Sequence, residues 1–257
     1  MKIGLKVYCT NDAYVVPAQK LYADGVIDFI EVFLVPGQMK QKIGQWIQLG
    51  VPLSLHAPHS VAGLNPSLAS DFAKNQQVIG EVVAVRNLCE PLYVVFHPGV
   101  DGDFDESIRQ FSWMMNSFPE MQNISLVENK PAKGLYGMNC LGTTPAEIRK
   151  MQGVTGIGFL LDFGHASCAA ATYGDDYQQT ISRFLELGPR AFHLSDGHIR
   201  SEDDEHLHIG HGDYNLAWFA KQIGDTGMVA LESMKDSPDN LDDFVGDVNS
   251  FKKILRG

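Results

Sequence analysis

Histidine and carboxylate residues recur at the ends of short apolar runs in this sequence. Six successive runs end on such a residue or beside one, and an additional histidine follows the fourth of them. These residues are His56, His97, Glu128, Asp162 with His165, His193 and Glu232. Imidazole and carboxylate groups are ligands for zinc, manganese and iron. Several carboxylates gathered in one small volume would repel each other, and cations would offset that repulsion. The pattern therefore predicts a metal centre.

A second candidate ligand group lies in the segment DGHIRSEDDEHLHIGHGDYN, after the run that contains His193. Asp204 and His206 stand two residues apart, so they point to the same side of an extended backbone. Gly210 and Gly212 allow the chain to turn back tightly. The alternative is a solvated acidic loop that also contains His208 and His211. The run-end residues favour metal binding.

The apolar runs alternate with segments of helical periodicity. We predict strands at Lys2–Val7, Phe29–Phe33, Pro52–His56, Leu92–His97, Ile124–Glu128, Gly158–Asp162, Ala191–Leu194 and Met228–Glu232. Helices are expected near 15–24, 38–49, 68–90, 104–118, 144–151, 174–187, 214–225 and 239–255, and none of the nine histidines lies in them. Repeats of about 32 residues fit one strand and one helix each.

This alternation predicts an α/β protein with a single domain over residues 1–257. Eight strand–helix units close most simply as a (β/α)8 TIM barrel, in which the ends of all strands meet at one mouth. An open doubly wound sheet is the structural alternative. No glycine-rich linker divides the chain.

Composition excludes several classes of protein. Lys and Arg total 20 against 31 Asp and Glu, a net charge of −11, which disfavours non-specific binding to nucleic acid. The four cysteines are far apart, which predicts reduced thiols and a cytoplasmic location. No signal peptide and no run of about 18 apolar residues is found, so no membrane contact is expected. The motifs GxxxxGK[ST], GxGxxG and GxSxG are absent, which disfavours triphosphatase, Rossmann and serine-hydrolase functions.

Together the motifs resemble the endonuclease IV family of the xylose-isomerase-like TIM-barrel superfamily, over most of the chain. The matching elements are His56, HPG at His97, EN at Glu128, DxxH from Asp162 to His165, HLxD at His193, DxHxxxGxG from Asp204, and LE at Glu232. The resemblance implies cleavage of a phosphodiester by water that metal ions activate. It also implies two to three divalent metals, with zinc preferred and manganese or iron as alternatives.

The same resemblance assigns the ligands. His56, His97 and Glu128 would hold the first metal. Glu128, Asp162, His193 and Glu232 would hold the second, with Glu128 as the bridge. His165, Asp204 and His206 would hold the third. Glu128 and Glu232 are the predicted catalytic residues.

The chain departs from the family pattern at three places that concern DNA. The first predicted strand, GLKVYCT, has no histidine motif, and the segment FLVPGQMKQKIGQW has two lysines and no arginine. His59 stands where the family has a DNA-stacking aromatic residue. The predicted substrate is therefore a small-molecule or nucleic-acid phosphodiester, with DNA the weaker candidate.

Two other functions remain open from the sequence. A sugar isomerase or epimerase of the same superfamily would use one metal at Glu128, Asp162, His193 and Glu232, with the two glutamates as acid–base groups. Glu31 suits sugar binding, but His56, His97 and the Asp204–His206 segment would then have no role. A metal-storing or scaffold barrel without activity is the third hypothesis.

Overall fold

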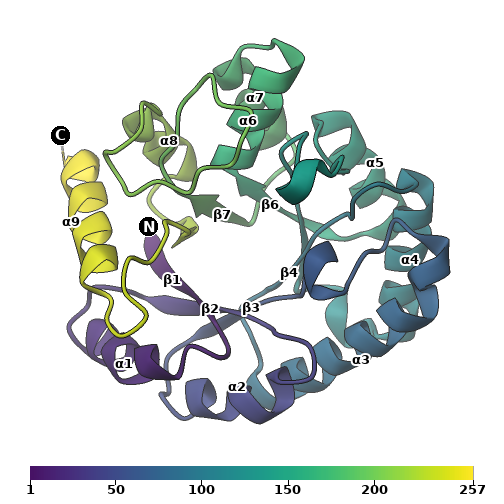
Figure 1. Cartoon of the computed structure of the whole chain (residues 1–257), viewed down its shortest axis with the longest axis horizontal. Coiled ribbons are helices and arrows are strands. Elements are labelled where there is room, and N and C mark those ends of the chain that lie inside the picture. The colour runs from purple at the N-terminus through teal and green to yellow at the C-terminus, as the bar shows by residue number, and fades with distance from the viewer. Residues whose placement is uncertain (257) are drawn as a thin grey trace.

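The computed structural model describes residues 1–256 and shows a closed barrel of eight parallel strands in chain order (Figure 1). The strands are β1 (Lys2–Tyr8), β2 (Phe29–Phe33), β3 (Leu53–His56), β4 (Val94–Phe96), β5 (Ser125–Glu128), β6 (Gly158–Asp162), β7 (Ala191–Leu194) and β8 (Met228–Leu231). Leu5 of β1 pairs with Ile30 of β2 and with Leu231 of β8, which closes the ring. The predicted (β/α)8 fold is confirmed.

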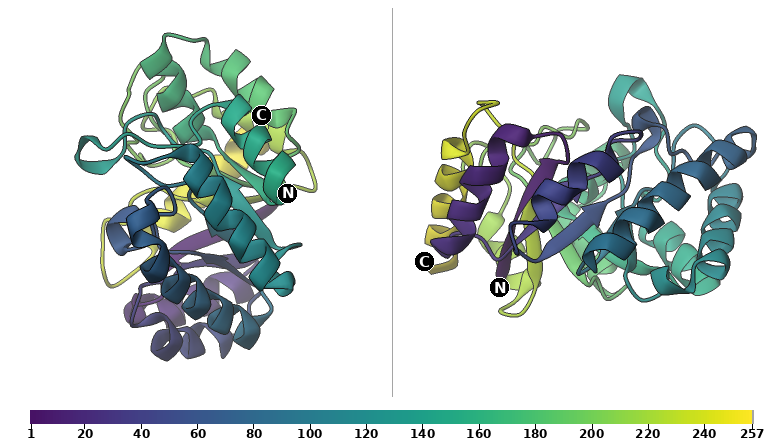
Figure 2. Two further views of the ribbon diagram at one scale, coloured as in Figure 1. Left: turned by 90° about the vertical axis from the view of Figure 1, so that its right-hand side faces the viewer. Right: turned by 90° about the horizontal axis from the view of Figure 1, so that it is seen from below.

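Nine helices among the described residues surround the strands (Figure 1). They are α1 (Val15–Ala23), α2 (Met39–Ile47), α3 (Phe72–Cys89), α4 (Phe104–Ser117), α5 (Pro145–Thr155), α6 (Phe163–Tyr173), α7 (Tyr177–Leu185), α8 (Leu216–Ile223) and α9 (Asp242–Arg256). Figure 2 shows the last helix, α9, standing beside the first, α1, where the barrel closes. The long helix predicted over 68–90 is a 3-10 turn at Ala69–Asp71 followed by α3.

The prediction that no histidine lies in a helix is wrong, because His165 is in the first turn of α6. The sequence pattern placed a helix only from residue 174, whereas α6 begins directly at the end of β6. The side chain of Asp162 caps it by accepting a 2.7 Å hydrogen bond from the His165 N–H. Residues 163–170 are all buried, so this helix has no amphipathic period to detect.

Apolar side chains fill the barrel interior beneath the mouth. One buried cluster consists of Phe29, Tyr93, Val95, Leu126, Leu160, Ala191 and Ala230. Because side chains alternate along a strand, six of these seven floor residues are followed two positions later by an inward residue of the mouth, and Tyr93 is followed by the floor residue Val95. Phe29 is thus followed by Glu31, Leu126 by Glu128, and Ala230 by Glu232. The polar side chains therefore lie directly above this apolar floor, at the mouth of the barrel.

Gly4 of β1 makes room for the ring of the floor residue Phe29. A Cβ atom at this position would lie 2.3 Å from the ring of Phe29. We expect Gly4→Ala to lower the free energy of unfolding by about 1–3 kcal/mol, because overpacking forces the ring and its strand to move. Denaturant unfolding measures this. Gly80→Ala in α3 is the control, because nothing lies within 4 Å of the added atom, and it should not destabilise the protein. Equal stability of Gly4→Ala and the wild type would contradict this account of the floor.

Candidate metal centre

All nine predicted ligands lie at the same end of the barrel. His56, Glu128 and Asp162 end their strands, His193 lies within β7, and His97 and Glu232 follow β4 and β8 directly. The other three are His165 at the start of α6 and Asp204 and His206 in the segment between β7 and α8. The strands are parallel, so their carboxyl ends form one mouth.

A first group of ligands joins β3, β4 and β5. His56 Nε2 lies 3.3 Å and His97 Nε2 2.7 Å from the same oxygen, Glu128 Oε2. Burial lowers the pKa of both imidazoles, so both are neutral and have a free electron pair at neutral pH. Burial raises the pKa of Glu128, but Lys130 and the charged His193 and His165 outweigh it and hold that pKa well below its usual range. Two neutral imidazoles and a carboxylate are a suitable donor set for zinc.

A second group joins α6 to the segment after β7. His165 Nε2 and His206 Nε2 lie 3.0 and 2.7 Å from Asp204 Oδ2. His206 adopts a left-handed backbone conformation, with φ of 49°. This conformation is uncommon for a residue other than glycine, and here it turns the imidazole toward Asp204.

Backbone carbonyls orient three of these imidazoles. The Nδ1–H groups of His56, His165 and His206 donate to the carbonyl oxygens of Ala57, Asn129 and Glu232, at 2.8, 2.9 and 2.8 Å. A carbonyl can only accept, so Nδ1 carries the proton and Nε2 is left to face the carboxylate. Metal-binding histidines are held in this way in proteins. The residues of both groups therefore fit divalent metal ions.

The centre of the mouth is more crowded. Around His193 Nδ1 lie Glu232 Oε1 at 2.5 Å, Glu128 Oε1 at 3.5 Å and Asp162 Oδ2 at 3.9 Å, so the structure brings together the four residues predicted for the second metal. His193 Nδ1 and Glu128 Oε1 are buried and make no hydrogen bond. Unpaired buried polar atoms at a barrel mouth are typical of a ligand site.

The sequence analysis did not identify Lys6 as a residue of this centre, and it considered Glu31 only as a sugar-binding residue. Lys6 Nζ forms an ion pair with Glu232 and lies 3.7 Å from Glu31 Oε1. Glu31 is fully buried and lies 2.9 Å from His193 Nε2. In β1, Lys6 lies two positions beyond Gly4, which faces the barrel interior, so the Lys6 side chain is directed inward as well.

Residues 25–253 match the family described as the xylose isomerase-like TIM barrel. The chain belongs to this family. The predicted superfamily is thereby confirmed, whereas its endonuclease IV branch stays a prediction. Two curated proteins that are similar to this chain are the uncharacterized proteins MJ1311 and MJ1614 of Methanocaldococcus jannaschii. They are 26% and 22% identical to it, over 78% and 79% of this chain and 71% and 77% of their own lengths.

Solved structures of this xylose isomerase-like barrel fold include proteins of different names. Endonuclease IV from Thermus thermophilus has a TM-score of 0.74 at 18% identity and covers 100% of this chain and 99% of its own. A D-tagatose 3-epimerase-like protein has a TM-score of 0.72 at 22% identity, covering 100% and 97%. At these identities the likeness concerns the fold alone. None of the described helices has the length and apolar character needed to cross a membrane.

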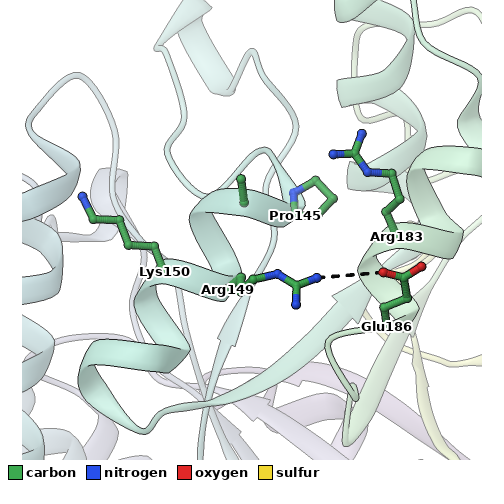
Figure 3. Close-up of a pocket in the computed structure, with 6 residues that line it drawn as sticks. Pro145, Arg149, Lys150, Arg183 and Glu186 are labelled. Carbon is green, nitrogen blue, oxygen red and sulfur yellow. Dashed lines mark ion pairs between the residues drawn. The ribbon is translucent and has the colours of Figure 1, made fainter.

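A surface depression of about 310 Å³ lies apart from the metal centre, between α5 and α7. Figure 3 shows its basic side chains, with Arg149 directed toward Glu186 at 3.9 Å. None of the nine predicted ligands lines it. The depression therefore lies outside the candidate metal centre.

Metal binding by the His165–Asp204–His206 group should depend on pH. Burial lowers the pKa of His206, but the carboxylate of Asp204 outweighs it and raises that pKa to about 9. Burial also lowers the pKa of His165, but Asp162 and Asp204 outweigh it and raise that pKa well above its ordinary value. Below pH 9 a metal must displace the proton of His206 and any proton on His165 Nε2, so the affinity should rise at least about tenfold per pH unit between pH 7 and 9. The His56–His97–Glu128 group, with neutral imidazoles, should show no such rise. Zinc competition with a chromophoric chelator measures both. The same pH dependence in both groups would contradict the assignment.

Proposed function

We propose that this protein is a metal-dependent hydrolase that cleaves phosphodiesters at the barrel mouth. The observation that carries the proposal is the presence of two separate histidine–carboxylate groups, His56–His97–Glu128 and His165–Asp204–His206. Glu128 lies between them, because its Oε2 faces the first group and its Oε1 lies 2.9 Å from His165 Nδ1. An isomerase that uses a single metal requires only one such group.

The metals of the two groups would have different roles in hydrolysis. Bound metals would lower the pKa of a water molecule and neutralise charge on the phosphate and on the departing oxygen. Glu128 lies between the two groups, with one carboxylate oxygen directed toward each of them. Lys130 Nζ lies 3.2 Å from His165 Nε2 and 4.0 Å from Glu128 Oε1, which places an ammonium where it can bind a phosphate oxygen.

Charge favours a small substrate over DNA. The net charge is −11, and a protein that binds the DNA backbone needs a cationic surface. In the segment after β2, the ammonium of Lys42 is already paired with Asp12. His59, at the position of the stacking residue, packs its ring against His97 at 5.8 Å and against Phe33 at 5.1 Å. We therefore propose a small-molecule phosphodiester.

The test compares metal-free protein with protein loaded with zinc or manganese, on bis(p-nitrophenyl) phosphate. We expect hydrolysis that requires metal and is stronger on this small diester than on a duplex that contains an abasic site. His208→Gln is a matched control, since His208 lies outside both groups and pairs with Asp236 and Asp247. Absence of hydrolysis under every metal tested would reject the proposal.

One observation favours the isomerase as a second candidate. Glu31 and Glu232 flank His193 in the buried centre, at 2.9 and 2.5 Å, and such carboxylates suit proton transfer on a sugar. The same protein samples should therefore be incubated with a ketose. Epimerisation at a carbon beside the carbonyl group, without phosphodiester cleavage, would select this function.

A further inference from the structure

We propose that the Lys6 ammonium takes the place of a metal ion at the centre of the mouth. Glu232 and Glu31 then act as its counter-ions and not as metal ligands, and the centre holds two metals, one in each outer group. The inference rests on the proposed function only in assuming that the two outer groups bind metal.

The first support is the position of Lys6. It is an inward residue in the middle of β1, and its ammonium reaches the mouth from the barrel interior. Only 19% of its side chain is exposed, against 6% for Glu232 and 0% for Glu31. A lysine anchored on a central strand and packed in this way cannot leave the site by swinging into solvent.

The second support is the atom that Lys6 contacts. Glu232 Oε1 is paired with Lys6 Nζ and is also the oxygen 2.5 Å from His193 Nδ1. A metal bound to this oxygen at about 2 Å would lie within about 5 Å of the ammonium. At that distance and in a buried site, a dication and an ammonium repel each other strongly. The ammonium already balances the charge that would attract the metal.

The third support is the set of ionic partners that surrounds Lys6. Glu31, the second counter-ion, accepts a 2.9 Å hydrogen bond from the Tyr93 hydroxyl and lies 2.9 Å from His193 Nε2. Burial lowers the pKa of Lys6, but Glu232 and Glu31 outweigh it and keep that pKa above its ordinary value. Lys6 and His193 thus form ion pairs with both buried carboxylates, although Glu31 Oε1 accepts no hydrogen bond.

Lys130 differs from Lys6 in its place and in its partners, although its side chain is also mostly buried, with 14% exposed. It follows β5 in the rim of the mouth, and its Nζ lies 4.0 Å from the nearest oxygen of Glu128, at the limit of an ion pair. Lys130 therefore forms no close ion pair with a carboxylate of the outer groups, whereas Lys6 does so with Glu232 at the central position.

The test is the metal content of Lys6→Met, measured by elemental analysis after saturation with zinc and removal of the excess. Methionine keeps the length and removes the charge. We expect two equivalents in the wild type and three in the variant, the extra ion being held by Glu31, His193 and Glu232. Without metal the variant should melt below the wild type, and zinc should raise its Tm by more. Three equivalents in the wild type, or no gain in the variant, would overturn the inference.

Glu232→Gln provides a second test that does not depend on the folding of Lys6→Met. If Glu232 is a counter-ion, this variant keeps two zinc equivalents. If Glu232 is a metal ligand, one equivalent is lost and the inference falls. The result is separable from the proposed function: two equivalents in a wild type that does not cleave phosphodiesters would support the role of Lys6 and reject the hydrolase.

Discussion

Glu128→Gln should lower phosphodiester hydrolysis at least about 10²-fold. Glu128 is the carboxylate of the His56–His97–Glu128 group, and it bridges to the other group through its Oε1, which lies 2.9 Å from His165 Nδ1. An amide of the same shape has no charge to offset repulsion between two dications, and it is a weaker metal ligand. We therefore expect the loss of at least one zinc equivalent together with the loss of activity.

The fold should survive this substitution, because the barrel floor lies beneath Glu128 and is apolar. Rates on bis(p-nitrophenyl) phosphate and elemental analysis measure the effect, and circular dichroism checks the fold. A variant that keeps both metals and its activity would remove Glu128 from the bridging role. A folded variant that loses metal but hydrolyses the diester as fast as the wild type would show that hydrolysis does not require that metal.

His206→Gly should remove the metal of the His165–Asp204–His206 group and leave the other in place. Glycine accepts the left-handed backbone of His206, where φ is 49°, so the loop need not rearrange. His206 is a cleaner choice than His165, because His165 also lies 2.9 Å from Glu128 Oε1. We expect one zinc equivalent instead of two, and activity reduced about 10²-fold through the lost stabilisation of charge on the departing oxygen.

The remaining zinc in this variant should bind with the affinity that the wild type shows for its His56–His97–Glu128 group. Isothermal titration of metal-free protein compares the two. Loss of both equivalents would show that the groups are not independent, and retention of both would show that His206 is not a ligand. His211→Gly is the matched control, since His211 lies in the same loop and belongs to neither group.

The barrel and the residues of its mouth could be predicted because polar and apolar side chains alternate with the two-residue period of a strand. Six of the eight strands place a polar residue two positions beyond an apolar floor residue, as Leu126 and Glu128 show, so the end of an apolar run marks the mouth. The segment Asp204–His206 belongs to no strand, and it could be predicted as part of the same site only together with the run-end residues and the DxHxxxGxG resemblance.

Other features escaped prediction for physical reasons. Helix α6 is buried on all sides over residues 163–170, so apolar periodicity gives no signal there. A single lysine in an apolar strand, Lys6, ordinarily indicates an exposed position. Its inward direction becomes clear only when β1 pairs with β2 and β8 and the ring closes. The ion pair with Glu232 joins residues 226 positions apart, which local patterns cannot detect.

The central claim is that the mouth of this barrel holds two metal ions in two separate groups. Anomalous diffraction from zinc-loaded crystals at the zinc absorption edge tests it directly. The account predicts two peaks, each about 2.0–2.2 Å from its ligand atoms. One should lie among His56, His97 and Glu128, and the other among His165, Asp204 and His206. A single peak bound by Glu128, Asp162, His193 and Glu232, with both outer groups empty, would contradict the claim and favour the isomerase.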